Sequence, residues 1–168
     1  SHWDADSVLS RFNRAPAGHW IDLPPDFAHV IAAALRIAGS SDGAFDPAIG
    51  HLVNAHGHGP TGASGPCNGW QHLAWDAAAR RLRQPGGLAL DLSGIAKGHA
   101  VDALANVLRR LPIGHALVEI GGELRGIGIR PDGEPWWVDL ENPPSAPLAP
   151  LRIALHDLAV ATSGTYIR

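Results

Sequence analysis

The sequence predicts an α+β fold, in which a helix-rich half of the chain is followed by a mostly antiparallel sheet. Segments 24–38 and 94–111 carry apolar residues at spacings of three and four, which is typical of amphipathic helices. Short segments of strand character, separated by turn residues, follow the second of these helices. The 168 residues show no internal repeat and no linker. Helices succeeded by strands in this way are typical of the α+β class.

The helix-rich half begins with segment 7–13, a short helix or turn whose packing partners must come from elsewhere because it is too short to be stable alone. Pro24-Pro25-Asp26 then offers a helix start, and the cluster of glycines and serines at 39–43 ends that helix. The glycine-rich segment 54–69 is expected to be the longest loop.

Two short strands at 72–76 and 80–84 are expected to form a hairpin. In segment 88–93 the leucines alternate with Asp91 and Ser93, which predicts a strand with the leucines on one face. The apolar stripe of helix 94–111 consists of Val101, Leu104, Ala105, Leu108 and Leu111. Further strands are expected at 115–120, 123–129, 136–141, 151–155 and 158–161.

Composition argues against several classes of partner. Charged residues make up 17% of the chain and the formal net charge is −3, which is the wrong sign for holding a phosphate backbone, so no nucleic acid is expected as a partner. No apolar run approaches the roughly 18 residues of a membrane span, and no signal-peptide pattern is visible. The single cysteine, Cys67, allows no internal disulfide. Because methionine is absent and the chain begins Ser1-His2-Trp3, we expect a processed or trimmed chain.

Segment 91–97 is the stretch most indicative of chemistry. Asp91 and Ser93 end the predicted strand, Gly94 turns the chain, and a helix begins at once. Such a junction presents unpaired backbone N–H groups and the positive end of the helix dipole, which suit a phosphate. Lys97 lies on the apolar stripe of the helix, where its ammonium could neutralise a phosphate or pair with Asp91. The structural alternative is a capping serine and a lysine that reaches past the core to solvent.

Segment 43–47 also allows two interpretations. An Asp followed by Pro is what a helix entrance looks like, so Asp46 could act as a cap. Alternatively, Gly43 admits a ligand, Phe45 supplies an aromatic face, and Asp46 accepts hydrogen bonds from the donor groups of a base or ring.

The remaining candidates are weaker. The two glycines within 119–123 are typical of a hairpin, although they would also permit close approach of a flat ligand. Segment 162–164 is a polar turn or a phosphate site. His56 and His58 have no Cys or carboxylate at ligand spacing nearby, so they indicate a metal site only weakly.

Taken together and in this order, the segments resemble the ApbE family of flavin transferases, also called FAD:protein FMN transferases. The most specific stretches are GAFDP at 43–47 and DLSGIAKG at 91–98. The resemblance runs nearly from end to end, through residues 1–3, 7–13, 41–47, 91–102, 119–123 and 161–164.

The resemblance implies a Mg²⁺-dependent reaction in which a Ser or Thr hydroxyl of an acceptor protein attacks FAD, retains FMN through a phosphoester and releases AMP. Some family members hydrolyse FAD instead. The carbonyl of Gly94 is implied as a metal ligand, in keeping with the oxygen ligands that such cations take. The residues implied in binding FAD are Trp3, Ala44, Phe45, Asp46, Asp91 and Lys97.

The chain also departs from the family. His56 and His58 stand where aromatic residues are usual, His99 replaces a tyrosine and Thr165 an acidic residue. Family members begin earlier, with a further strand, and continue past Arg168 with a histidine segment and a metal-binding segment. We therefore expect residues 1–168 to form an incomplete ApbE-like domain that is inactive by itself, in which no catalytic residue is identified. The alternative is a non-catalytic FAD-binding or scaffold protein.

The resemblance also bears on location. Members of the family are usually exported in bacteria and often lipid-anchored, which implies a periplasmic or exported protein. Any membrane contact would then come through a lipid anchor outside this chain, which itself shows no lipobox cysteine.

Overall fold

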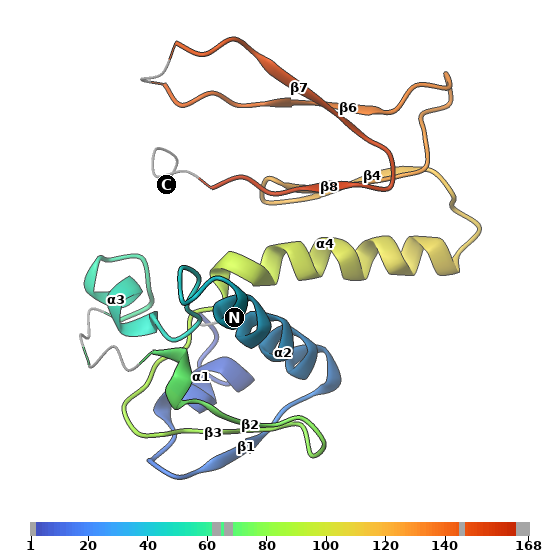
Figure 1. Cartoon of the computed structure of the whole chain (residues 1–168). Helices are drawn as coiled ribbons and strands as arrows, with labels where there is room; N and C mark the ends of the chain where they lie inside the picture. The colour runs from blue at the N-terminus through green and yellow to red at the C-terminus, as the bar shows by residue number, and fades with distance from the viewer. Residues whose placement is uncertain (1–2, 62–64, 66–68, 145–146, 164–168) are drawn as a thin grey trace. The chain divides into compact units, whose positions relative to one another are not determined.

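A computed structural model describes residues 3–61, 65, 69–144 and 147–163 (Figure 1). The chain forms two compact units, Ser1–Ile95 and Ala96–Arg168. Each combines helical and antiparallel strand segments, which confirms the predicted α+β class. No helix among the described residues is long and apolar enough to cross a bilayer.

The first unit packs helices against a small sheet. Its strands pair antiparallel in the order β1-β3-β2. The predicted helices at 7–13 and 24–38 and the predicted hairpin are confirmed, whereas β1 and α3 were not predicted. The elements are α1 (Val8–Arg14), β1 (Trp20–Asp22), α2 (Pro25–Ser40), α3 (Gly50–Ala55), the 3-10 turn η1 (Trp70–His72), β2 (Ala74–Asp76) and β3 (Arg81–Arg83).

The helix α1 is stabilised by a cap and by docking. The Ser7 hydroxyl accepts a hydrogen bond from the Ser10 N–H at 3.2 Å, which satisfies one of the donors left free at a helix start. Phe12 is fully buried. It joins a core that includes Ile31 from α2 and Leu82 from β3. A helix of seven residues thus depends on packing for its stability.

Segment 88–92 differs from the prediction. Within the described part of the chain it pairs with no strand, although Leu88, Leu90 and Leu92 are buried as expected. Ala89 is buried too, because the backbone of Gly50 packs directly on it: a Cβ at Gly50 would lie 2.8 Å from the Ala89 carbonyl oxygen. The prediction that segment 88–93 forms a strand is therefore wrong.

Side-chain amides supply the hydrogen bonds that a neighbouring strand would otherwise give to the backbone of this segment. The Asn13 carboxamide oxygen accepts from the Leu90 N–H at 2.8 Å, and its NH₂ group donates to the Leu90 carbonyl at 3.0 Å. Gln84 is fully buried. Its NH₂ group donates two hydrogen bonds and its carboxamide oxygen accepts two. A buried backbone group without a partner is costly, so these two amides permit an isolated extended segment inside the unit. The backbone partners of Gln84 are Phe12 O and Leu88 O as acceptors and Gly86 N–H and Leu88 N–H as donors.

The second unit places a long helix against antiparallel strands. The helix α4 (Ser93–Arg110) starts at the end of the first unit and continues into the second. The strands form a sheet of order β4-β5-β8 and a separate hairpin of β6 and β7. All five strands were predicted at these positions. Their bounds are β4 (Ala116–Ile120), β5 (Glu123–Ile127), β6 (Trp136–Leu140), β7 (Leu151–Leu155) and β8 (Ala159–Val160).

The apolar stripe predicted for α4 is narrower than expected. Val101 and Ala105 are buried with Val118 and Ile127 of the sheet. Leu104 and Leu111, however, are 42% and 50% exposed. At about 100° per residue these two leucines lie roughly 60° and 80° around the helix from Val101. Their inclusion in the buried stripe is wrong because the spacing of three also fits the edge of a helical face.

Candidate functional site

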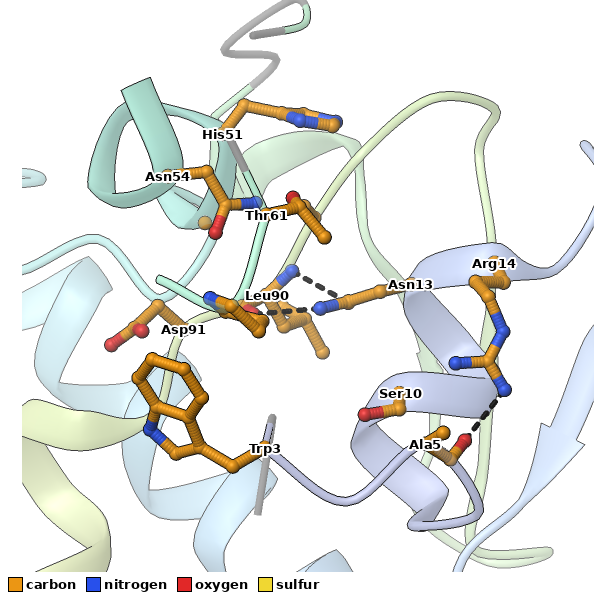
Figure 2. A pocket seen from close by; sticks show the side chains of 13 residues that line it. Trp3, Ala5, Ser10, Asn13, Arg14, His51, Asn54, Thr61, Leu90 and Asp91 are labelled. Carbon is orange, nitrogen blue, oxygen red and sulfur yellow. Dashed lines mark hydrogen bonds between the residues drawn. The ribbon is translucent and has the colours of Figure 1, made fainter. Parts of the chain in front are cut away.

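The first unit contains a cavity of about 300 Å³ (Figure 2). It lies between the N-terminal segment, α1, α3 and the extended segment that ends at Asp91. Trp3 and Asp91, two of the residues predicted to bind a flavin nucleotide, both line it. In Figure 2 they are seen on one side of the cavity and Arg14 on the other. The lining residues that carry polar side chains are Ser10, Asn13, Arg14, His51, Asn54, Thr61 and Asp91, together with the indole of Trp3.

Asp91 lines the cavity and also binds the first residue of α4. Its carboxylate accepts hydrogen bonds from the Ser93 N–H at 2.9 Å and from the Ser93 hydroxyl at 3.2 Å. A carboxylate at a helix start satisfies free donors and complements the dipole. The capping alternative is thus realised, with Asp91 rather than Ser93 as the accepting side chain. The carboxylate is half-buried, and its backbone N–H is held by the Pro47 carbonyl at 2.9 Å.

The predicted contact residues at 44–46 lie outside the lining of this cavity among the residues that the structure describes. Asp46 accepts from the Ala48 N–H at 2.7 Å and from the Trp70 N–H at 3.2 Å. It therefore closes a turn, whereas α3 begins later, at Gly50. Both of its carboxylate oxygens bind backbone N–H groups, but Asp46 does not cap α3, whose N-cap residue is Ile49, so the helix-entrance interpretation is wrong in that form; Ala44 is exposed.

Phe45 and Gly94 are brought together within the first unit. A Cβ placed on Gly94 would lie 3.2 Å from Cε2 of Phe45, so the ring covers the start of α4 where only a hydrogen now stands. Segment 43–47 and the start of α4, some fifty residues apart in sequence, thus meet around this contact. A bulkier residue than glycine at 94 would displace the ring.

Lys97 has a partner that the sequence did not indicate. Its ammonium lies 2.7 Å from the Glu123 carboxylate and donates to the Gly121 carbonyl at 2.9 Å. Gly121 and Gly122 have φ values of 58° and 90° and form the two-residue turn between β4 and β5, as the hairpin interpretation predicted. The Lys97 side chain is about half exposed.

Within the part of the chain that the structure describes, His56 and His58 belong to no metal-binding group of side chains. His56 directs Nδ1 to the Leu52 carbonyl of its own helix at 2.9 Å, and both His56 and His58 are exposed. Among residues 3–61, 65, 69–144 and 147–163, no three His, Cys, Asp or Glu side chains are grouped so that they could hold a metal ion.

The polar end of the chain is described only in part. Thr162 and Ser163 are exposed. Ser1, His2, Cys67, Gly164 and Thr165 lie outside the described residues.

Sequence reasoning missed two residues of α3 that face the cavity. His51 and Asn54 are three positions apart, which places them on one side of a helix. That spacing could have revealed them, but the glycines that follow hide a helix of only six residues. The His51 Nε2 atom lies 2.9 Å from the Gly87 carbonyl.

Perturbed carboxyl groups occur away from the cavity. The Gly128 N–H and then Arg109 lower the pKa of Asp157. Arg152 lowers the pKa of Asp139 across the β6–β7 hairpin. Backbone N–H bonding from Ala79, followed by Arg81, lowers the pKa of Asp76. Each of these carboxyl groups is in an ion pair with an arginine; Asp139 and Asp157 are exposed, whereas Asp76 is half-buried.

Comparison with known proteins gives a consistent result. The model of the ApbE family matches residues 1–168. A protein named FAD:protein FMN transferase from Vibrio cholerae is 35% identical over 179 residues, covering 99% of this chain and 53% of the relative. Another protein of that name, from Salmonella typhimurium, is 32% identical over 182 residues, which cover 99% of this chain and 52% of the relative. The chain therefore spans about half the length of the curated relatives it matches.

Solved structures agree. The apo form of the flavinyl transferase ApbE from Pseudomonas stutzeri matches with a TM-score of 0.84 and 35% identity, covering 99% of this chain and 55% of that one. The flavin transferase ApbE from Vibrio cholerae matches with a TM-score of 0.87 and 34% identity, covering 99% and 58%.

Proposed function

Because the chain belongs to the ApbE family, we propose that it is part of a flavin transferase that moves FMN from FAD to a Ser or Thr of an acceptor protein. The observation that carries the proposal is the cavity of the first unit, which Trp3 and Asp91 line together although they lie far apart in sequence. The names of the relatives support FAD as the substrate and a flavoprotein as the acceptor.

In the proposed reaction, the acceptor hydroxyl oxygen forms a bond to the phosphorus of the FMN half of FAD. The bond from that phosphorus to the bridging oxygen breaks, AMP leaves with that oxygen, and the hydroxyl proton passes to the solvent. In this scheme the exposed ring of Trp3 stacks on a flat part of FAD. Asp91 accepts hydrogen bonds from hydroxyl or amino groups, and Lys97 opposes the negative charge of the pyrophosphate.

Magnesium enters the proposal through the family resemblance. The Gly94 carbonyl is an oxygen ligand of the kind that Mg²⁺ takes. The described residues provide no cluster of three ligating side chains around it, so the donor set present here does not amount to a magnesium site. We assign no step of the reaction to the metal.

The test is to combine FAD with the complete protein that contains this chain, and with residues 1–168 alone, and to measure both binding and AMP release. Binding is followed by quenching of flavin fluorescence, and release by chromatography of the nucleotides. The expected result for the complete protein is FAD binding with AMP release that requires Mg²⁺ and ceases with EDTA. FAD binding without AMP release would instead favour the non-catalytic flavin-binding protein. Absence of binding in the complete protein would exclude both functions.

Replacing Lys97 with alanine is expected to weaken FAD binding by well over tenfold, because a hydrogen bond to a charged group contributes ~1.5–3 kcal/mol. Fluorescence titration of the complete protein measures the change. Glu123→Gln provides the control, since it keeps the ammonium and removes its ion-pair partner. Equal losses in the two variants would mean that the ion pair supports the β4–β5 turn and that Lys97 makes no contact with FAD.

A further inference from the structure

Asn13 makes a two-bonded contact in the wall of the cavity. Both ends of its carboxamide bind the backbone of a single residue, Leu90, at 2.8 and 3.0 Å (Figure 2). Asn13, Leu90 and Asp91 all line the cavity. The carboxamide reproduces the pair of bonds that a neighbouring strand would supply in an antiparallel ladder.

This contact fixes the segment that carries Asp91. The backbone of Asn13 is itself anchored, because the preceding residue, Phe12, is fully buried in the core. Leu90 is the residue directly before Asp91, so the two amide bonds constrain the peptide from which the Asp91 side chain projects. The N–H of Asp91 itself donates a hydrogen bond to the Pro47 carbonyl.

We propose that Asn13 is a positioning residue, which holds Asp91 at the place in the cavity where it would meet FAD. The proposal rests on the proposed function for its ligand, although the contact itself does not. Asn13 acts through Leu90 and is assigned no contact with the nucleotide.

The chemistry of the pair explains why an amide is needed. A carboxylate could still accept from the Leu90 N–H, but it has no proton to donate to the Leu90 carbonyl and would repel that oxygen. When protonated, a carboxyl group regains the donor. The titratable or charged side chains that share the cavity with this position are Arg14, His51 and Asp91.

Asn13→Asp in the complete protein is the decisive variant. We expect FAD affinity to fall about tenfold at pH 7, and the ratio of variant to wild-type affinity to recover as the pH is lowered toward 4, where the introduced carboxyl takes up a proton. Two-dimensional NMR is expected to show faster hydrogen exchange of the Asp91 amide than in the wild type at pH 7, and the ratio of the two rates, each pair compared at the same pH, is expected to return toward one at low pH.

Asn54→Asp is the matched control, because it makes the same exchange in the lining of the same cavity, from α3. It adds the same charge near the ligand, and we expect exchange of the Asp91 amide to stay at the wild-type rate. The proposal is overturned if the two variants weaken FAD binding equally while the Asp91 amide is unchanged in both. If the wild-type protein does not bind FAD, the proposed function fails, and exchange of the Asp91 amide still decides whether Asn13 positions this segment.

Discussion

Replacing Asp91 with alanine is expected to reduce FAD affinity well over tenfold in the complete protein. The carboxylate lines the cavity, and its loss removes charged hydrogen bonds worth ~1.5–3 kcal/mol each from the bound nucleotide. It also removes both bonds that cap the first turn of α4 at Ser93. Isothermal titration with FAD, at a temperature well below the unfolding transition of the variant, measures the effect.

Asp91→Asn separates the two roles of this side chain. An asparagine can still accept from the Ser93 N–H, so the helix cap is largely retained while the negative charge is lost. We expect thermal stability close to that of the wild type together with weakened FAD binding. Wild-type affinity in both the alanine and the asparagine variants would show that Asp91 serves only to begin α4.

Replacing Gln84 with leucine is expected to have the largest effect on stability. Leucine is similar in size but removes the bonds that Gln84 makes to both the N–H and the carbonyl of the buried Leu88, together with one bond each to the Phe12 carbonyl and the Gly86 N–H. Orphaned buried groups cost ~1–3 kcal/mol each. Since the structure relaxes in part, we expect the free energy of unfolding to fall by about 3–5 kcal/mol. Urea denaturation followed by tryptophan fluorescence provides the measurement.

The chain offers its own control for this exchange. Gln71, in η1, is exposed, and Gln71→Leu is expected to change stability by no more than about 0.5 kcal/mol, as is usual for surface positions. A loss of similar size at positions 71 and 84 would show that the buried hydrogen bonds of Gln84 contribute little. An intact Gln84→Leu protein with wild-type stability would lead to the same conclusion.

The parts of the fold that local patterns encode were predictable from the sequence. The breakers around α2 and the alternation in β4 to β7 were enough to place these elements. The Gly121-Gly122 turn was equally predictable, because a two-residue hairpin turn with positive φ at both central residues favours glycine at these positions. The chemistry of segments 43–47 and 91–97 could be seen only as a choice between capping and ligand binding, since the same residue types serve both.

The rest could not be predicted because it depends on contacts between distant residues. The alternation in segment 88–92 is that of a strand, but Ala89 is buried by Gly50 and the ladder is replaced by Asn13 and Gln84. No local signal shows that an asparagine in α1 will bind Leu90. For the same reason, the cavity and its lining by His51 were not predictable from any single segment.

The amide pair of Asn13 and Leu90 also has a consequence for how the protein folds. Its two partners are 77 residues apart, and closing a loop of this length costs about 4 kcal/mol in chain entropy. The chain loses this entropy before the contact contributes any stabilisation, and contacts of long sequence separation are associated with slow folding. We therefore expect the wall that carries Asp91 to form late in folding, after the N-terminal helix has docked, whereas the local hydrogen bonds of α4 require no such closure.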